Sequence, residues 1–197
     1  MKQLAKGLVN TLCIVIVSPL IILNLLAYRF SQSEGLFVAS AQLLSLLPGK
    51  TGHFLRKNFF RFTMSHCHAD CLIGFATLFS HRDTEIHQGV YIGPQCNIGK
   101  SKIEQNCLLG SGVHILSGKG QHNFDDLDKP IQSQGGTLTQ IRIGEDTWIG
   151  NGAIIMANIG KKCVVGAGSV VIKDIPDYSI VGGNPAKIIK SRQGGTG

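Results

Sequence analysis

Branched aliphatic residues recur at every sixth position through much of the chain, and a glycine usually follows each of them. After one step shortened by two residues, between Ile155 and Ile159, the interval of six resumes. A helix repeats at 3.6 residues and a strand at 2, so neither accounts for this period. A short strand and a turn, wound repeatedly about one axis, do account for it. The pattern therefore predicts a mainly β protein, a parallel β-helix with its aliphatic residues inside. The positions from 143 onward are Ile143, Ile149, Ile155, Ile159, Val165 and Val171.

The same spacing extends the predicted β-helix back to about residue 62. Aliphatic or aromatic residues keep the interval from Ile73 to Ile115. With three six-residue sides per coil, residues 73–115 and 141–175 predict four to five coils in a domain spanning 62–177. Residues 116–140 break the period and are rich in Gly, Asp and Gln, which predicts a loop ejected from the coil. Such a loop can reach a neighbouring subunit.

An uncharged, apolar segment lies near the start of the chain. It runs from Gly7 to Tyr28, between Lys6 and Arg29. About 20 residues of helix cross the hydrocarbon core of a bilayer, so this segment predicts a membrane helix. Pro19 leaves two paths open, a kinked helix that spans the membrane and a helix that re-enters it. Bases are more numerous after the segment than before it, which predicts that its C-terminal side is cytoplasmic.

Three further segments complete the predicted organisation. Residues 35–47 are apolar but too short to span. Residues 53–61 mix bases with large apolar side chains, which is typical of a helix in the lipid head-group region; a helix packed on the β-helix is the alternative. Residues 1–61 are thus predicted to be a membrane-anchoring helical region. Pro185 can open a short helix, so 178–197 is predicted to be a C-terminal helix and tail.

Charge and cysteine content narrow the classes of partner. Residues 1–61 hold seven bases and one acid, whereas residues 62–197 are nearly balanced. This argues against a nucleic-acid interface on the repeat domain and favours anionic lipid. The six cysteines form no CxxC pair, and we interpret them as buried thiols in a reducing cytoplasm. The histidines and cysteines of 66–71 match no zinc spacing, so no metal is expected.

Four motifs in the C-terminal half resemble a known family. They are 148–151 (WIGN), 166–171 (GAGSVV), 173–176 (KDIP) and 183–187 (GNPAK). Over about 86–190 the chain resembles the hexapeptide-repeat acyltransferases, specifically the galactoside, maltose and nodulation-type O-acetyltransferases. The resemblance implies a left-handed β-helix, a homotrimer, and acetyl-CoA bound in a groove between two subunits. It also implies a catalytic histidine on or near the ejected loop.

His122 occupies the position that the resemblance assigns to the catalytic histidine, and His114 is the alternative. A sugar hydroxyl is a poor nucleophile at neutral pH and needs a base as it attacks the thioester. Imidazole has a suitable pKa and can return the proton to the departing sulfur. Asp125 or Asp126 could orient His122, although either could equally be an acidic residue of the loop tip.

The resemblance also assigns residues to acetyl-CoA. It places Asn151 and Ala167 beside the pantetheine arm, and Lys173, Lys187 and Lys190 near the phosphates. Lysine supplies a point charge to an anionic group. The alternative for Lys187 and Lys190 is a solvated tail.

These expectations combine into one predicted function. The chain is predicted to be an acetyl-CoA-dependent O-acetyltransferase at the inner membrane, with its catalytic domain facing the cytoplasm. Its carbohydrate acceptor is predicted to be a lipid-linked or surface-polysaccharide precursor. Two alternatives stay open: a zinc-dependent hydratase of the carbonic-anhydrase type, drawing on His81, His87, His114 and His122, and a non-catalytic scaffold.

Overall fold

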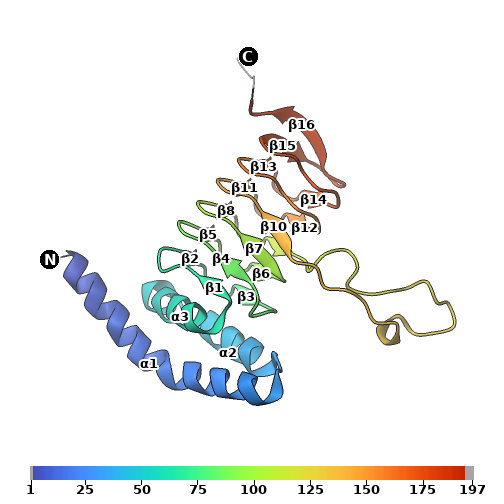
Figure 1. Cartoon of the computed structure of the whole chain (residues 1–197). Helices are drawn as coiled ribbons and strands as arrows, with labels where there is room; N and C mark the ends of the chain where they lie inside the picture. The colour runs from blue at the N-terminus through green and yellow to red at the C-terminus, as the bar shows by residue number, and fades with distance from the viewer. Residues whose placement is uncertain (1, 194–197) are drawn as a thin grey trace.

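Three helices precede a triangular β-helix and close one of its ends (Figure 1). The computed structural model describes residues 2–193, and of residues 2–6 only the backbone. The helices are α1 (Lys2–Ser31), α2 (Gly35–Ser45) and α3 (Gly49–Thr63). Helix α1 is continuous through Pro19. In the part of the chain that the structure describes, one helical segment, Gly7–Ser31, is long and apolar enough to cross a membrane.

The β-helix has three parallel sheets, one for each side of the coil. Most strands have only two residues, because the chain turns a corner after each short side. Sheet A contains β1 (His66–Cys67), β4 (Glu85–Ile86), β7 (Ser101–Ile103) and β10 (Ile141–Ile143). Sheet B contains β2 (Leu72–Ile73), β5 (Tyr91–Ile92), β8 (Leu108–Leu109), β11 (Trp148–Ile149), β13 (Val164–Val165) and β15 (Ser179–Gly182). Sheet C contains β3 (Leu78–Phe79), β6 (Asn97–Ile98), β9 (His114–Ile115), β12 (Ile154–Ile155) and β14 (Val170–Val171).

The predicted β-helix is confirmed, and its inward positions are the aliphatic residues of the six-residue repeat. Ile73, Ile92, Leu109 and Ile149 follow one another in sheet B, and all are fully buried. The predicted number of coils is too low, since sheet B carries β2, β5, β8, β11, β13 and β15 in register. The shortened step also has a structural consequence. It reduces sheet A to the isolated bridges that Ile159 makes with Ile143 and Ile175.

Helix α3 packs on the first coil of the β-helix, between that coil and α1. Phe59 and Phe60 are fully buried, and the Phe60 ring lies 4.8 Å from that of Phe79 in sheet C. This packing is the arrangement given by the alternative prediction for residues 53–61, a helix packed on the β-helix. The open end of a β-helix leaves an apolar core that needs a cover.

A buried arginine joins the helices to the β-helix. Arg56 is 1% exposed, and its guanidinium donates to the carbonyl oxygens of Leu44, Leu47 and Ile73. Burial lowers the pKa of this group. These carbonyls belong to the end of α2, the turn that follows it, and β2, so one side chain holds three segments together.

The predicted C-terminal helix is wrong. Residues 187–191 form strand β16 (Lys187–Ser191), which pairs antiparallel with β15. Pro185 lies in the turn between the two strands. Strand β15 is the last in its sheet and would otherwise present unpaired backbone groups at an edge, which β16 satisfies.

All six cysteines are buried and free. The pKa of the Cys107 thiol is raised to about 12, chiefly by burial. Cysteines in such apolar surroundings fill the core, as the sequence predicted, and are not placed as nucleophiles.

Candidate functional site

The predicted ejected loop is an extended arm that leaves the β-helix at the corner between sheets C and A (Figure 1). We call residues 117–140 the loop arm. Backbone hydrogen bonds join its two halves, from Thr139 to Ser117, from Thr137 to Gly120 and from Asn123 to Gly135. The short 3₁₀-helix Ile131–Ser133 lies on its outer part. The arm is thus a defined structure and projects away from its own coil.

His122 lies in the outgoing half of the loop arm and is exposed. It follows Gln121, and both residues pass closely against Gly136 on the returning half. A Cβ atom at position 136 would lie 2.8 Å from the backbone nitrogen of His122, a distance that real Cβ atoms do not show. A glycine therefore permits the two halves to meet where His122 is positioned.

The two aspartates considered as partners of His122 differ in their surroundings. Asp126 accepts a hydrogen bond from the backbone N–H of Asp128 and pairs with Lys129, 2.8 Å away. The Lys129 ammonium lowers the pKa of this carboxyl. Asp126 is thus engaged within the loop tip, while Asp125 is exposed.

A cavity of about 270 Å³ lies where the loop arm meets sheet C. Its lining includes His81, Asn97, His114 and Gln121. Asn97 and His114 are register neighbours on the outer face of sheet C. The sequence offers His114 as the alternative base but does not single out Asn97 or Gln121. Part of this cavity lining can be predicted from the sequence. Asn97 and His114 each precede an inward isoleucine, so their side chains must point outward.

Asn151 and Ala167 lie on a different corner, between sheets B and C. The backbone N–H of Gly168 donates to the carbonyl of Asn151, so the two turns stack directly. The Asn151 side-chain oxygen accepts from the Ser111 N–H at 3.1 Å. Both residues are exposed, and Gly150 gives the Ala167 backbone room to approach. The predicted pantetheine residues therefore form one narrow edge, which the width of sheet C separates from the loop arm.

The three predicted phosphate-binding lysines are exposed but do not lie together. Lys173 follows β14 on the corner that carries the loop arm, whereas Lys187 and Lys190 lie on β16 beside sheet B. Within residues 2–193 none of the three makes an ion pair with a carboxylate. Within one chain, the structure thus distributes the predicted site over two edges.

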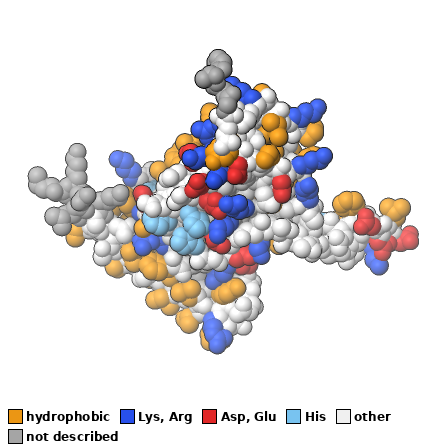
Figure 2. Space-filling view, turned by 45° about the horizontal axis from the view of Figure 1, so that its top comes forward, with side chains coloured by type: hydrophobic (Ala, Val, Ile, Leu, Met, Phe, Trp, Pro, Cys, Tyr) orange, Lys and Arg blue, Asp and Glu red, His pale blue; other side chains and the backbone are white. Residues whose placement is uncertain are grey.

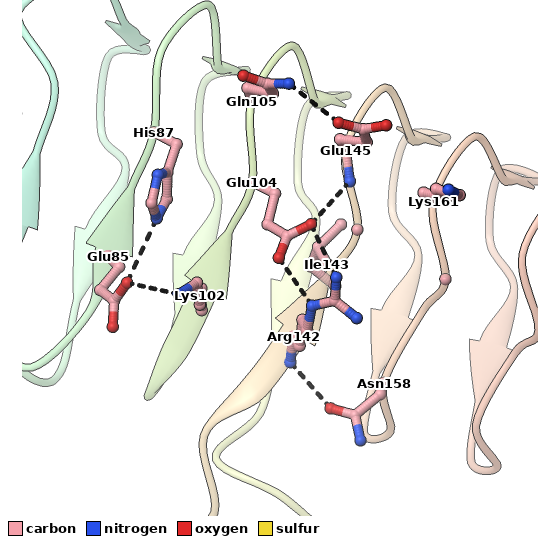
Figure 3. Close-up of polar contacts among 12 residues, drawn as sticks. Glu85, His87, Lys102, Glu104, Gln105, Arg142, Ile143, Glu145, Asn158 and Lys161 are labelled. Carbon is pink, nitrogen blue, oxygen red and sulfur yellow. Dashed lines mark hydrogen bonds and ion pairs between the residues drawn. The ribbon is translucent and has the colours of Figure 1, made fainter.

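Sheet A carries a ladder of charged residues that pair with one another (Figure 3). Glu85 pairs with His87 and Lys102, and Arg142 binds Glu104 through two hydrogen bonds of 2.7 and 3.0 Å. His87 therefore lies on a different side of the coil from His114. In the described residues no three His, Cys, Asp or Glu side chains form a metal-binding group.

Sheet B presents apolar side chains to solvent. Leu72, Tyr91, Leu108 and Trp148 are register neighbours on its outer face, and each is 39–53% exposed. Val164 and Ile180 continue the row toward β16. A row of this kind is typical of a surface that another protein covers.

Comparisons with known proteins agree with this architecture. Residues 140–173 match the family model described as the hexapeptide repeat of succinyl-transferase. A maltose O-acetyltransferase from Clostridium difficile 630 superposes with a TM-score of 0.70 at 24% identity, covering 79% of this chain and 84% of that one. A galactoside acetyltransferase in complex with coenzyme A gives 0.67 at 19% identity, covering 79% of each chain.

A third solved structure extends the comparison. A hexapeptide-repeat acetyltransferase from Vibrio cholerae O1 biovar eltor, complexed with acetyl-coenzyme A, gives a TM-score of 0.65 at 20% identity, covering 83% of this chain and 91% of that one. Comparison with curated proteins found no match. The fold of this chain is therefore that of the hexapeptide-repeat acetyltransferases, as the sequence motifs predicted.

Proposed function

We propose that this protein is an acyltransferase that moves the acetyl group of acetyl-CoA to a hydroxyl of a carbohydrate. The observation that carries the proposal is the exposed His122 on the loop arm, which projects from the β-helix (Figure 1). An imidazole in that position is available to a groove formed with a second copy. The fold, shared with proteins complexed with coenzyme A or acetyl-coenzyme A, supports the choice of donor.

In the proposed mechanism His122 accepts the proton of the acceptor hydroxyl as that oxygen attacks the thioester carbonyl. The carbon–sulfur bond then breaks, and the proton passes from the imidazolium to the sulfur of CoA. General base catalysis of this kind contributes about 10² to 10⁴-fold to the rate. Asn151 and Ala167 would border the pantetheine arm, and Lys173, Lys187 and Lys190 would face the phosphates. No covalent acyl-enzyme is needed, in keeping with the burial of every cysteine.

The proposed active assembly is a homotrimer. The apolar row on sheet B supports it, since such a row is stable in water when a neighbouring subunit covers it. The assembly would also bring the edge with Asn151 and Ala167 of one subunit toward the loop arm of another. One subunit contact would therefore both cover the apolar row and bring the two parts of the proposed site together.

The proposed location is the cytoplasmic face of the inner membrane, where a lipid-linked or surface-polysaccharide precursor would be the acceptor. The apolar segment Gly7–Ser31 and the excess of bases in residues 1–61 support this location. A lipid-linked acceptor would explain why one polypeptide combines such a segment with an acetyltransferase fold.

The test is transfer of labelled acetyl from acetyl-CoA into a membrane extract by the detergent-solubilised protein. His122→Ala is expected to lose about 10² to 10⁴-fold in kcat while still binding acetyl-CoA. His87→Ala, on sheet A, is the matched control and is expected to stay within about threefold of wild type, because the ring lies away from the proposed groove.

Two results would overturn the assignment. Full activity in His122→Ala together with loss in His114→Ala would move the base to the cavity at sheet C. Absence of measurable acetyl-CoA binding by the wild type would reject the enzyme in favour of a scaffold.

A further inference from the structure

The side of α1 that faces away from the β-helix is a continuous apolar strip. Together with the exposed Pro19, its members form rows spaced by three and four residues, as one face of a helix requires. No charged residue occurs from Gly7 to Tyr28. We call this strip the outer face of α1; its large exposed side chains are Leu8, Leu12, Val15, Ile16, Ile22, Leu23, Leu26 and Phe30.

The opposite side of α1 is held by α2 and α3. Cys13, Val17 and Ile21 are buried there. Two side-chain hydrogen bonds hold the helix, one toward each end of its apolar segment. Asn58 of α3 donates to Asn10 at 3.0 Å, and Asn24 donates to Ser40 of α2 at 2.9 Å. Fourteen residues, or about 21 Å of helix, separate the two hydrogen bonds on α1, so the helix is attached along its length.

This attachment is incompatible with a helix that crosses the bilayer beside the β-helix. Helix α3, which carries Asn58 and the buried Arg56 and Lys57, contacts β1 and β2 of the first coil. If α1 crossed a membrane with these contacts intact, α3 and the first coil would enter the hydrocarbon region. Charged and irregular backbone segments there carry a large energetic cost.

The three helices instead form a layer at one end of the β-helix. Figure 1 shows α1 lying across the helical end of the β-helix, and Figure 2 shows hydrophobic side chains gathered over the lower part of the molecule. Leu43 and Leu46 of the α2 region, 62% and 64% exposed, add to the apolar surface of this end. Bases bound the strip, with Lys6 before it in the sequence and the exposed Arg29 near its end.

We infer that α1 lies in the plane of one leaflet, with its outer face in the acyl region and its flanking bases at anionic phospholipid head groups. The apolar strip supplies hydrophobic affinity, and the bases at both ends of the same horizontal helix supply attraction to anionic lipid. The protein is thus monotopic, with both ends of α1 on the cytoplasmic side. This inference refines the membrane location in the proposed function and leaves the acetyl-transfer chemistry independent of it.

The first test is flotation of the purified full-length protein with preformed vesicles, either neutral phosphatidylcholine or a 3:1 mixture with phosphatidylglycerol. Wild type is expected to float with both and at least threefold more strongly with the anionic mixture. A triple variant, Leu12→Glu, Ile16→Glu and Leu23→Glu, is expected to lose at least tenfold in bound fraction. Leu127→Glu, which alters the 95% exposed loop-arm leucine, is the control and is expected to float like wild type.

The second test decides between lying in the leaflet and crossing it. Single cysteines are introduced by Gln3→Cys or Ser191→Cys, and sealed inverted membrane vesicles are treated with a membrane-impermeant maleimide. The native thiols are buried and give little background. Labelling of both variants in these vesicles supports the inference, whereas protection of Gln3→Cys alone indicates a spanning helix and overturns it.

Other outcomes also count against the inference. Flotation of the triple variant at the wild-type level would remove the outer face as the lipid contact. Absence of wild-type flotation, with a larger oligomer in detergent-free solution, would assign the face to a second copy of the chain. Acetyl transfer to a soluble carbohydrate in detergent is measured in parallel, because its loss would challenge the proposed function and not the membrane geometry.

Discussion

Gly136 is important because it has no side chain. It lies where the returning half of the loop arm crosses Gln121 and His122, and a side chain there would collide with that backbone. Placement of the proposed base therefore depends on a contact about 14 residues distant in the sequence. Arg56 shows the same dependence in the core, where its partners are backbone carbonyls of three separate segments.

We predict that Gly136→Ala lowers kcat by about 10 to 100-fold, because shifting a catalytic group by about 1 Å has effects of this size. The KM for acetyl-CoA should change by less than about threefold, since none of the residues proposed to bind acetyl-CoA belongs to the loop arm. Steady-state kinetics on the purified protein measures both constants.

Gly120→Ala is the matched control. An added Cβ there would lie 3.6 Å from the Thr137 carbonyl oxygen, an ordinary contact, so near-wild-type kinetics are expected. If Gly136→Ala kept the wild-type kcat, the loop arm would not be positioning the catalytic group.

At the scale of elements, the three sheets share one repeat but present different surfaces. Sheet A exposes paired charges, sheet B exposes apolar residues, and sheet C borders the cavity with Asn97 and His114. The outward position of each strand carries this difference, while the inward position is aliphatic in most strands. Once the coil is known, the outward residue of each strand therefore indicates which kind of surface its sheet presents.

The charge ladder of sheet A should make stability depend on acid pH. Arg142 lowers the pKa of the Glu104 carboxyl below its ordinary value. The stabilisation is therefore present above the unfolded pKa of about 4.3 and is lost as pH falls through the lower folded value. Glu104→Gln is expected to reduce the free energy of unfolding at pH 7 by about 1 kcal/mol or less, because Arg142 is 57% exposed.

Urea unfolding between pH 3 and pH 7 measures this dependence. The difference between wild type and Glu104→Gln should shrink as pH falls below 4. Glu145→Gln, whose carboxylate accepts from Gln105 and forms no ion pair with an arginine within residues 2–193, should show a smaller effect. A difference for Glu104→Gln that stays constant over this pH range would contradict the assigned ion pair.

For the whole molecule, the separation of the predicted site residues is the central fact. His122 and Lys173 lie on one corner of the coil, and Asn151 and Ala167 lie on another. One chain cannot bring the two groups together, because a β-helix packed with isoleucines does not bend to do so. Activity should therefore require assembly.

We predict that Trp148→Arg combined with Leu108→Arg converts an oligomer into monomers and lowers acetyl transfer at least tenfold. Both side chains lie on the apolar row of sheet B, and two desolvated charges at a subunit contact are strongly unfavourable. Sedimentation velocity gives the mass, and activity is measured on the same samples.

Gln88→Arg, at an exposed turn after sheet A, adds a charge without entering that row and is expected to leave mass and activity unchanged. An unchanged mass in the double variant would show that the row is not the subunit interface.

The sequence by itself determined the coil, its inward residues and the position of the loop arm, and it supplied the residues proposed for the site. These features follow from a period of six residues and from short motifs, both of which depend only on residues close together in the sequence. Only the tertiary structure decided that α3 covers the first coil, that residues 187–191 pair as a strand, and that the predicted site is divided between two edges. It also decided that α1 is hydrogen-bonded to α3 at Asn10 and to α2 at Asn24. Each of these features depends on residues distant in the sequence. Whichever segment the fold brings there covers the open end of the apolar core or pairs with the free edge of the last strand.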